Sequence, residues 1–284
     1  MLAAYLELAK PRITFLVALT AAFGYYLGSL GQVRDMAALF EFLAGTALGA
    51  GGAGVLNHLL ERDVDRRMQR TCDRPLPAGR VGASAALSFG ICLVLTGLAI
   101  LLLTANLLTA FLALLSAFLY VVVYTPMKRM TWLNTSFGAI PGALPPMGGG
   151  VAATGQVDAG AWALFAILFA WQHPHFFAIA WLFREDYGRG GFKMLPVVEP
   201  DGRSTCRQII GFSVLLIPLS VLPTLLGLSG VVYMAGAILL GLGMLATAIL
   251  LTISRSNLDA RRLLKASVIY LPLLLILSVA DLSF

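Results

Sequence analysis

The sequence has 284 residues, of which 59% are hydrophobic and only 12% are charged. Ordinary soluble domains carry about 25% charged residues, so this composition excludes such a domain and indicates a membrane protein. The formal net charge of +6 does not indicate a nucleic-acid partner, because basic loops on one side of a membrane and attraction to anionic lipid produce the same excess.

Nine apolar stretches follow one another along the chain, each close to the roughly 20 residues that cross the hydrocarbon core. Gly, Pro, Asn and charge clusters separate them. Lys10 and Arg12 precede the first stretch, which therefore does not resemble a cleaved signal peptide. The expected helices span approximately residues 13–31, 37–60, 83–103, 107–125, 133–153, 159–183, 209–227, 231–252 and 266–283.

The basic residues predict the orientation of these helices. Nineteen of the 20 Lys and Arg residues fall in the amino-terminal tail and in the loops after the second, fourth, sixth and eighth helices, and only Arg34 falls on the other side. The amino terminus is therefore expected in the cytoplasm and the carboxyl terminus outside. We expect an all-α, polytopic bundle of nine transmembrane helices, a single domain over residues 1–284 with loosely tandem halves. Its three cysteines form no disulfide or zinc pattern.

The second expected helix ends in a row of polar residues. Asn57, Glu61 and Asp65 follow at intervals of four, so on a continuing helix they share one face, whereas Asp63 points away. Two carboxylates and an amide oxygen form a ligand set suited to Mg²⁺. The alternative is a solvated helix end whose acids pair with neighbouring arginines. Ionisable groups inside a membrane bundle are costly and usually functional, which favours the metal site.

A second acidic segment follows the sixth expected helix and reads REDYGRGGFKMLPVVEPDG. Glu185 and Asp186 are candidates for a second metal site, and Lys193 lies in the flexible loop that follows. A plain connecting loop is the alternative. The active-site loops are thus expected at about residues 57–80 and 184–207.

The fourth expected helix ends in YTPMKRMTWLN, which contains Tyr124, Lys128, Arg129 and Asn134. Positive-inside flanking alone would explain the two basic residues. Together with facing carboxylates, however, they form a site for a magnesium-bridged diphosphate, in which acids hold the metal and bases neutralise the leaving group.

Several sequence blocks spread over about two thirds of the chain resemble one family. The N-x-x-x-E-x-x-x-D row with RT and DRPLPAGR is similar to the first acidic motif of the UbiA-type intramembrane prenyltransferases. Within them, the chain resembles the protohaem IX farnesyltransferases, or haem O synthases. The blocks that carry this resemblance are KPRIT, YTPMKR, LNTSFGAIPGALPPMGG, WQHPHFFAIAW and DYGRGGFKMLPVV.

The resemblance implies a nine-helix bundle with a central cavity and the transfer of a farnesyl group from farnesyl diphosphate to a vinyl group of haem B. It also implies that Asn57, Glu61 and Asp65 bind Mg²⁺. Phe183 and Tyr187 stand where the superfamily usually has two aspartates, which leaves one or two metal ions open. The resemblance further implies that Arg70, Arg74, Lys128, Arg129 and Lys193 stabilise the charge of the diphosphate. Tyr124, Asn134 and Tyr187 are further candidates for substrate binding, and Asp186 is a further candidate catalytic acid.

Histidines in the sixth expected helix indicate that the substrate that accepts the prenyl group is larger than a simple quinone precursor. His173 and His175 flank Pro174, which interrupts helical hydrogen bonding and could turn an imidazole toward the cavity. Axial ligation of haem iron, with His175 the better candidate, is one interpretation. A histidine bonded to a helix carbonyl or a neighbouring side chain is the other. His58 would line the diphosphate site or only pack.

Three alternatives to this function remain open at the level of sequence: a UbiA-type enzyme for an aromatic or quinone precursor, a transporter with broken midplane helices, and a structural haem-handling subunit. The expected partners are farnesyl diphosphate, haem B and the lipid bilayer, with no nucleic acid. Haem A synthase or terminal oxidase assembly factors are further candidate partners. A bacterial inner membrane, with the active site on the cytoplasmic side, is the expected location.

Overall fold

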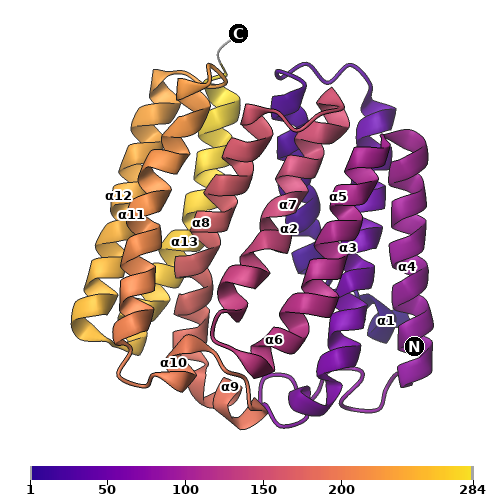
Figure 1. Ribbon diagram of the computed structural model, residues 1–284, viewed down its shortest axis with the longest axis vertical. Helices are drawn as coiled ribbons and strands as arrows, with labels where there is room; N and C mark the ends of the chain where they lie inside the picture. Colours follow the sequence, from indigo (N-terminus) through magenta and orange to yellow (C-terminus); the bar gives the residue numbers. More distant parts are fainter. Residues whose placement is uncertain (1, 283–284) are drawn as a thin grey trace.

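Helices account for most of residues 2–282, the part of the chain that the computed structural model describes. Within that range no β-strand occurs, and an isolated bridge joins Ser229 to Leu282. The all-α prediction is therefore confirmed (Figure 1). The elements are α1 (Leu2–Leu8), α2 (Pro11–Gly28), α3 (Met36–Asp65), α4 (Ala83–Thr104), α5 (Leu107–Phe118), the π-helical turn η1 (Leu119–Tyr124), α6 (Thr125–Met130), α7 (Asn134–Thr154), α8 (Ala159–Leu182), α9 (Arg184–Gly190), α10 (Leu195–Val198), α11 (Arg203–Leu225), α12 (Val231–Ser254) and α13 (Asn257–Ala280).

The protein is an integral membrane protein with several spans. Seven helical segments of the described chain are long and apolar enough to cross a bilayer: α3, α4, the segment from α5 to α6, α8, α11, α12 and α13. Two other long helices, α2 and α7, occupy the places of the remaining predicted spans. The nine-span topology and the orientation of the termini stay predictions.

Several helices extend beyond the limits expected from hydropathy. α3 continues to Asp65 rather than ending near residue 60, and α11 and α13 begin six and nine residues earlier than expected. Polar first turns explain the early starts, since Ser256 accepts a hydrogen bond from the backbone N–H of Asp259 and caps α13. The predicted end of the last helix at residue 283 lies outside the described residues.

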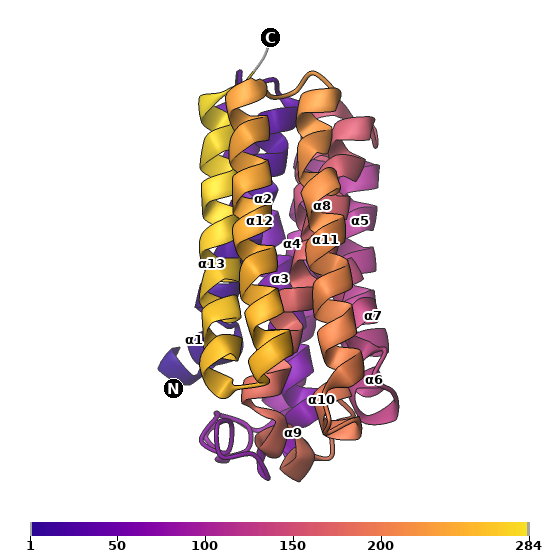
Figure 2. The same ribbon diagram turned by 90° about the vertical axis from the view of Figure 1, so that its left-hand side faces the viewer.

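One end of the bundle gathers the short elements. Two views at right angles place α1, α6, α9 and α10 at the same end, together with the loop that follows α3 (Figures 1 and 2). We call this the site end. The carboxyl end of α13 lies at the opposite end.

α7 lies inside the bundle, with 13 of its 21 residues buried. It packs against α2, α5 and α8, and a Cβ atom at Gly149 would overlap the carbonyl oxygen of Ala21. Small residues thus allow α2 and α7 to approach closely. Pro145 cannot donate to the carbonyl of Pro141, and the Ser116 hydroxyl donates to that oxygen instead at 2.9 Å.

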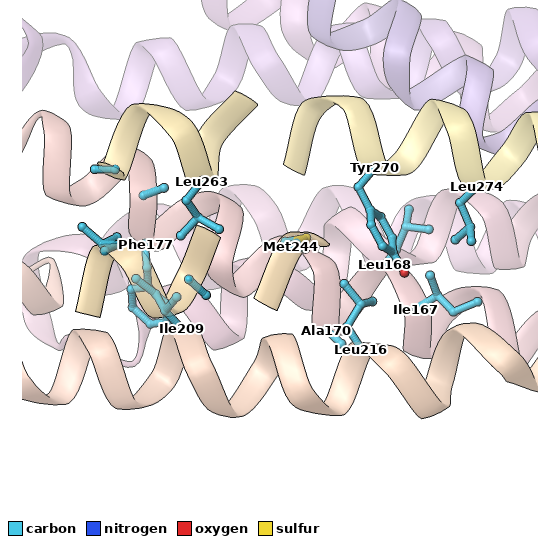
Figure 3. Packing of buried hydrophobic residues seen from close by; sticks show 14 of the residues in the cluster. Ile167, Leu168, Ala170, Phe177, Ile209, Leu216, Met244, Leu263, Tyr270 and Leu274 are labelled. Atoms are coloured by element: carbon cyan, nitrogen blue, oxygen red, sulfur yellow. The ribbon is translucent and has the colours of Figure 1, made fainter. Parts of the chain in front are cut away.

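An apolar core joins α8, α11, α12 and α13 in the carboxyl-terminal half of the chain. Phe177 of α8, Ile209 of α11, Met244 of α12 and Tyr270 of α13 are each at most 1% exposed. Figure 3 shows these side chains packed between the helices. The core fixes α8 against α13, and both helices carry residues discussed below.

Candidate active site

The predicted polar row of α3 lies inside the bundle. Asn57, Glu61 and Asp65 are 1%, 4% and 0% exposed, and they share a face because α3 remains helical to its last member. Asp63 is exposed and pairs with the flanking Arg62 and Arg66. The buried carboxylates therefore differ in surroundings from the solvated one on the same helix.

Lys10 meets the first member of this row. It lies in the left-handed region, with φ at 51°, between α1 and α2, and its Nζ donates to Asn57 Oδ1 at 2.7 Å. Burial of the ammonium lowers the pKa of Lys10 to about 7, and the nearby Glu61 carboxylate partly opposes this shift. The amide of Asn57 is oriented by a bond of 2.9 Å to the hydroxyl of Thr125.

The π-helical turn η1 positions this amide. Thr125 Oγ1 donates to the carbonyl oxygen of Tyr120 at 2.8 Å, and the Tyr120 hydroxyl also lies 3.3 Å from Lys10 Nζ. Turns of this kind insert a residue into a helix and occur often at functional sites. Here the turn brings polar groups of η1 and α6 to Asn57 of α3.

Lys128 meets the second member of the row. Its Nζ lies 2.7 Å from Glu61 Oε1, with side chains that are 12% and 5% exposed. The ammonium also lies 4.6 Å from the ring centre of Tyr124 and 5.6 Å from that of Phe192. Charge pairing and aromatic faces together compensate for the burial of this cation.

Arg74 forms an ion pair with Asp65, the third member of the row. Its Nη1 donates to both carboxylate oxygens of Asp65 at 2.9 and 3.0 Å. The Thr71 hydroxyl donates to the Asp65 carbonyl oxygen at 3.0 Å. The loop after α3 thereby folds back over the end of its own helix.

His58 is the buried side chain of this region that lacks partners. It is 3% exposed, and neither ring nitrogen forms a hydrogen bond within residues 2–282. Buried polar atoms normally have a partner. A polar ligand beside the row of α3 would supply one.

Asp186 of α9 binds the loop after α3. It accepts from the backbone N–H groups of Gln69 and Arg70 at 2.8 and 3.3 Å, and Arg189 donates to it at 2.9 Å. Burial alone raises the pKa of Asp186, but these hydrogen bonds outweigh it and the pKa lies below its usual value. Glu185, its predicted companion in a second metal site, is exposed.

Two further contacts close the site end. Arg70 donates to the Tyr187 hydroxyl at 3.1 Å and lies 4.5 Å from the ring centre of Phe183. Asn134, buried at the start of α7, donates to the carbonyl oxygen of Lys193 at 3.1 Å. The side chains of Lys193 and Arg129 are exposed at the rim, where Arg129 donates to the Leu60 carbonyl oxygen at 3.2 Å.

The donors fit a magnesium diphosphate better than a metal cage made by protein alone. No group of three or more His, Cys, Asp or Glu side chains suited to a metal occurs in the described part of the chain. The row offers two carboxylates and one amide, all oxygen donors, and Mg²⁺ usually completes such a set with water and substrate phosphate. The three cations opposite the row suit the phosphate oxygens.

The two histidines of α8 differ in their surroundings. His173 is fully buried, between Phe169, Ser136 and Phe212. His175 is half-buried and bonds to Ser267 of α13 at 2.8 Å. They lie near the site end, because α8 ends at Leu182.

Sequence reasoning did not select Lys10, Tyr120 or Thr125 as site residues. The available signal was the KPRIT block, in which a lysine stands directly before a proline. Proline disfavours the helical conformation of the residue before it. The helix is therefore interrupted at Lys10, and the lysine side chain can enter the bundle.

Comparison with known proteins places these residues in a family. The UbiA prenyltransferase family matches the chain over residues 17–270. The chain belongs to this family. The family match confirms the resemblance to UbiA-type membrane prenyltransferases that the sequence showed.

Curated relatives match this UbiA protein over nearly its whole length. The protoheme IX farnesyltransferase of Salinibacter ruber is 51% identical over 277 residues, and that of Solibacter usitatus is 46% identical over 286 residues. In both cases 98% of each chain is covered.

Solved structures share the fold of this UbiA protein. One, described in a study of digeranylgeranylglyceryl phosphate synthase, matches with a TM-score of 0.84 and 19% identity over 99% of this chain and 98% of the other. A UbiA homologue from Archaeoglobus fulgidus bound to GPP and Mg²⁺ matches with a TM-score of 0.68 and 18% identity over 96% and 99% of the two chains. At these identities the likeness shows the fold.

Proposed function

We propose that this prenyltransferase moves the farnesyl group of farnesyl diphosphate to a vinyl group of haem B, giving haem O and diphosphate. The names of the two full-length relatives support the choice of acceptor and donor. The observation that carries the proposal is the buried row of Asn57, Glu61 and Asp65, with a separate cation beside each member. We further propose a single domain of nine spans, with the site end on the cytoplasmic side of a bacterial inner membrane.

The row of α3 would hold the diphosphate through a metal ion. Magnesium bound to oxygens of Asn57, Glu61 and Asp65 supplies positive charge that stabilises the departing diphosphate. The unpartnered ring of His58 beside this row offers a further polar contact. Glu185 and Asp186 remain candidates for a second ion, and Asp186 already receives three hydrogen bonds from the chain.

The chain's own cations would bind the phosphate oxygens. Lys10, Lys128 and Arg74 contact the row directly, so they would lie beside any phosphate that the row binds. Their positive charge stabilises the negative charge that builds up as the leaving group departs. Arg70, Arg129 and Lys193 would extend this field at the rim, where substrate arrives from water.

The reaction is an ionisation followed by two bond formations. The bond between farnesyl C1 and the diphosphate oxygen breaks, and both electrons leave with the oxygen. The vinyl electron pair then forms a carbon–carbon bond to the allylic cation, and water adds to the resulting carbocation with loss of a proton. The protein supplies charge and limits the access of water, and no covalent nucleophile is required.

Aromatic rings beside Lys128 suit the step of the reaction in which the farnesyl group is a cation. Tyr120 and Tyr124 stack with ring centres 5.7 Å apart, and Lys128 lies close to the ring of Tyr124. The face of an aromatic ring attracts positive charge. These rings would stabilise a carbocation that forms beside them.

The acceptor would lie against α8. Its histidines are near the site end, and Pro174 between them removes one backbone donor from the helix. Haem is larger than a simple quinone precursor, and a histidine offers its iron a nitrogen ligand. Asn134 and Tyr187, which tie the site loops together, would position both substrates indirectly.

The test is an assay of purified protein with farnesyl diphosphate, haem B and Mg²⁺, in which extracted haem is analysed by mass. We expect a product heavier by one farnesyl group and one hydroxyl group, and its loss on chelation of Mg²⁺. Glu61→Gln and Asp65→Asn are expected to reduce turnover by at least about 100-fold, because each removes a charge from the metal site.

Asp63→Asn is the matched control, since Asp63 lies on the same helix but is exposed. It should retain nearly full turnover. Prenylation of an aromatic acid but not of haem would reject the acceptor, and near-normal turnover of Glu61→Gln at saturating Mg²⁺ would reject the role of the row.

A further inference from the structure

The two imidazoles of α8 differ in which ring nitrogen is free. His173 Nδ1 lies 2.8 Å from the Phe169 carbonyl oxygen, which can only accept, so Nδ1 carries the proton. Nε2 then accepts from Ser136 Oγ at 3.1 Å, and the ring stacks on Phe212 with centres 3.5 Å apart. Both nitrogens of His173 are therefore occupied.

His175 has one nitrogen engaged. Its Nδ1 lies 2.8 Å from Ser267 Oγ, and that hydroxyl donates to the Leu264 carbonyl oxygen at 2.7 Å. A serine hydroxyl has a single hydrogen. Because Ser267 uses it on the carbonyl, it must accept from His175 Nδ1–H, and the lone pair of the neutral ring is then on Nε2. In the described part of the chain, the ring nitrogen of His175 that forms a hydrogen bond is Nδ1.

The orientation of this ring is fixed from two directions. Trp171 stacks on His175 with ring centres 4.8 Å apart and an interplanar angle of 20°, and Trp171 Nε1 donates to the Ser267 backbone oxygen at 2.8 Å. Ser267 itself is 0% exposed. The neighbouring core between α8 and α13, which includes Phe177 and Tyr270 (Figure 3), holds the two helices together.

We infer that His175 Nε2 is the axial ligand of the acceptor's haem iron, and that Ser267 is the positioning residue that holds the imidazole in its iron-binding tautomer. This inference rests on the proposed function for the identity of the acceptor. A histidine that binds a metal commonly donates its other N–H to a fixed acceptor, which sets the tautomer and the ring orientation. The chain from His175 through Ser267 to the Leu264 carbonyl has this form.

The position of His175 agrees with this role. It precedes the end of α8 at Leu182 by seven residues, or about 10 Å at the helical rise. It therefore lies near the end of the bundle that carries the row of α3. A porphyrin bound to Nε2 would extend from α8 near the same end, where the farnesyl diphosphate is proposed to bind.

The experiment measures haem ligation separately from turnover. Full-length protein in detergent is titrated with haem B without farnesyl diphosphate, and absorption, electron paramagnetic resonance and resonance Raman spectra are recorded. Wild type should show imidazole-bound iron. His175→Ala should lose that signature and regain it on addition of free imidazole, because imidazole can occupy the vacated space.

Ser267 is tested with three variants of α13. Ser267→Ala should weaken haem binding by about 10–100-fold and alter the iron–imidazole signature, as loss of such supporting partners typically does. Ser267→Thr keeps the hydroxyl and should stay close to wild type. Ser278→Ala is the matched control, since Ser278 is also a buried serine of α13 and bonds to Ser229; it should leave the spectra unchanged.

Two outcomes overturn the inference: His175→Ala with an unaltered imidazole signature, or Ser267→Ala with the spectra and affinity of Ser278→Ala. If His175→Ala does not fold, the comparison of Ser267→Ala with Ser267→Thr decides. Mass analysis of the product separates this inference from the proposed function. Wild type that makes haem O without histidine ligation contradicts only the inference, whereas folded wild type that makes no haem O contradicts the function.

Discussion

Replacement of Lys128 by Met should destabilise the protein strongly, because it leaves the Glu61 carboxylate buried without its cation. The Glu61 side chain is 5% exposed and that of Lys128 is 12% exposed. Removal of one partner from such a buried pair costs about 3–5 kcal/mol. By contrast, the Arg62–Asp63 pair on the same helix has side chains 43% and 62% exposed, and an exposed pair contributes about 1 kcal/mol or less.

These free energies translate into a measurable difference in Tm. At about 2–4 °C per kcal/mol for a chain of this size range, Lys128→Met should lower Tm by about 6–20 °C and Arg62→Met by about 4 °C or less. The measurement is thermal unfolding of detergent-solubilised protein followed by circular dichroism. The double variant Lys128→Met with Glu61→Gln should recover most of the lost Tm, because no charge then stays buried alone. Equal shifts for Lys128→Met and Arg62→Met, or no recovery in the double variant, would refute the reasoning.

Three further variants test other parts of the structure. Gly149→Ala should lower the stability by about 1–3 kcal/mol, because its Cβ would overlap a backbone carbonyl of α2; Gly148→Ala, whose Cβ has nothing within 4 Å, should be close to neutral in the same unfolding assay, and equal effects would contradict this packing. Asp186→Ala should open the arginine-rich loop after α3 to trypsin at neutral pH, since the two hydrogen bonds that hold this loop are lost, whereas Glu185→Ala should leave the cleavage rate unchanged; protection retained in Asp186→Ala would exclude the proposed anchoring. Lys10→Met should raise KM for farnesyl diphosphate and lower kcat, because it removes one of three cations beside the row, and unaltered kinetics would remove Lys10 from the site.

Hydropathy was sufficient to predict most of the architecture. The apolar stretches are long and separated by charge clusters, so helices such as α4 and α12 match their predicted limits within about two residues. The same signal cannot place polar helical turns, and α11 and α13 therefore begin earlier than expected. It also does not reveal α1, α9 or η1, whose conformations depend on contacts with the rest of the bundle.

Helical periodicity was sufficient to place one side of the candidate site. Intervals of four residues put Asn57, Glu61 and Asp65 on one face of α3. Their partners could not be predicted in this way, since Lys10 lies 47 residues from Asn57 and Lys128 lies 67 residues from Glu61. Such pairs depend on how helices pack, which spacing within one helix does not encode.

Asp186 illustrates the limit of reasoning from residue type. An acid beside a second acid suggested a metal ligand. In the structure its oxygens receive backbone N–H groups of a loop more than a hundred residues earlier in the chain. Its metal role stays a prediction, while its part in holding the two loops together follows from the contacts.

The burial of α7 has a consequence for biogenesis. This helix contains three prolines, does not reach the apolarity of the seven segments suited to crossing a bilayer, and packs against α2, α5 and α8. The carbonyl group of Pro141 accepts from Ser116 of α5, and Gly149 packs against the backbone of α2, so neighbouring helices rather than lipid surround this span. Translocation machinery that releases helices singly into lipid would therefore release α7 poorly, and its integration must be cooperative with adjacent helices that are synthesised before and after it.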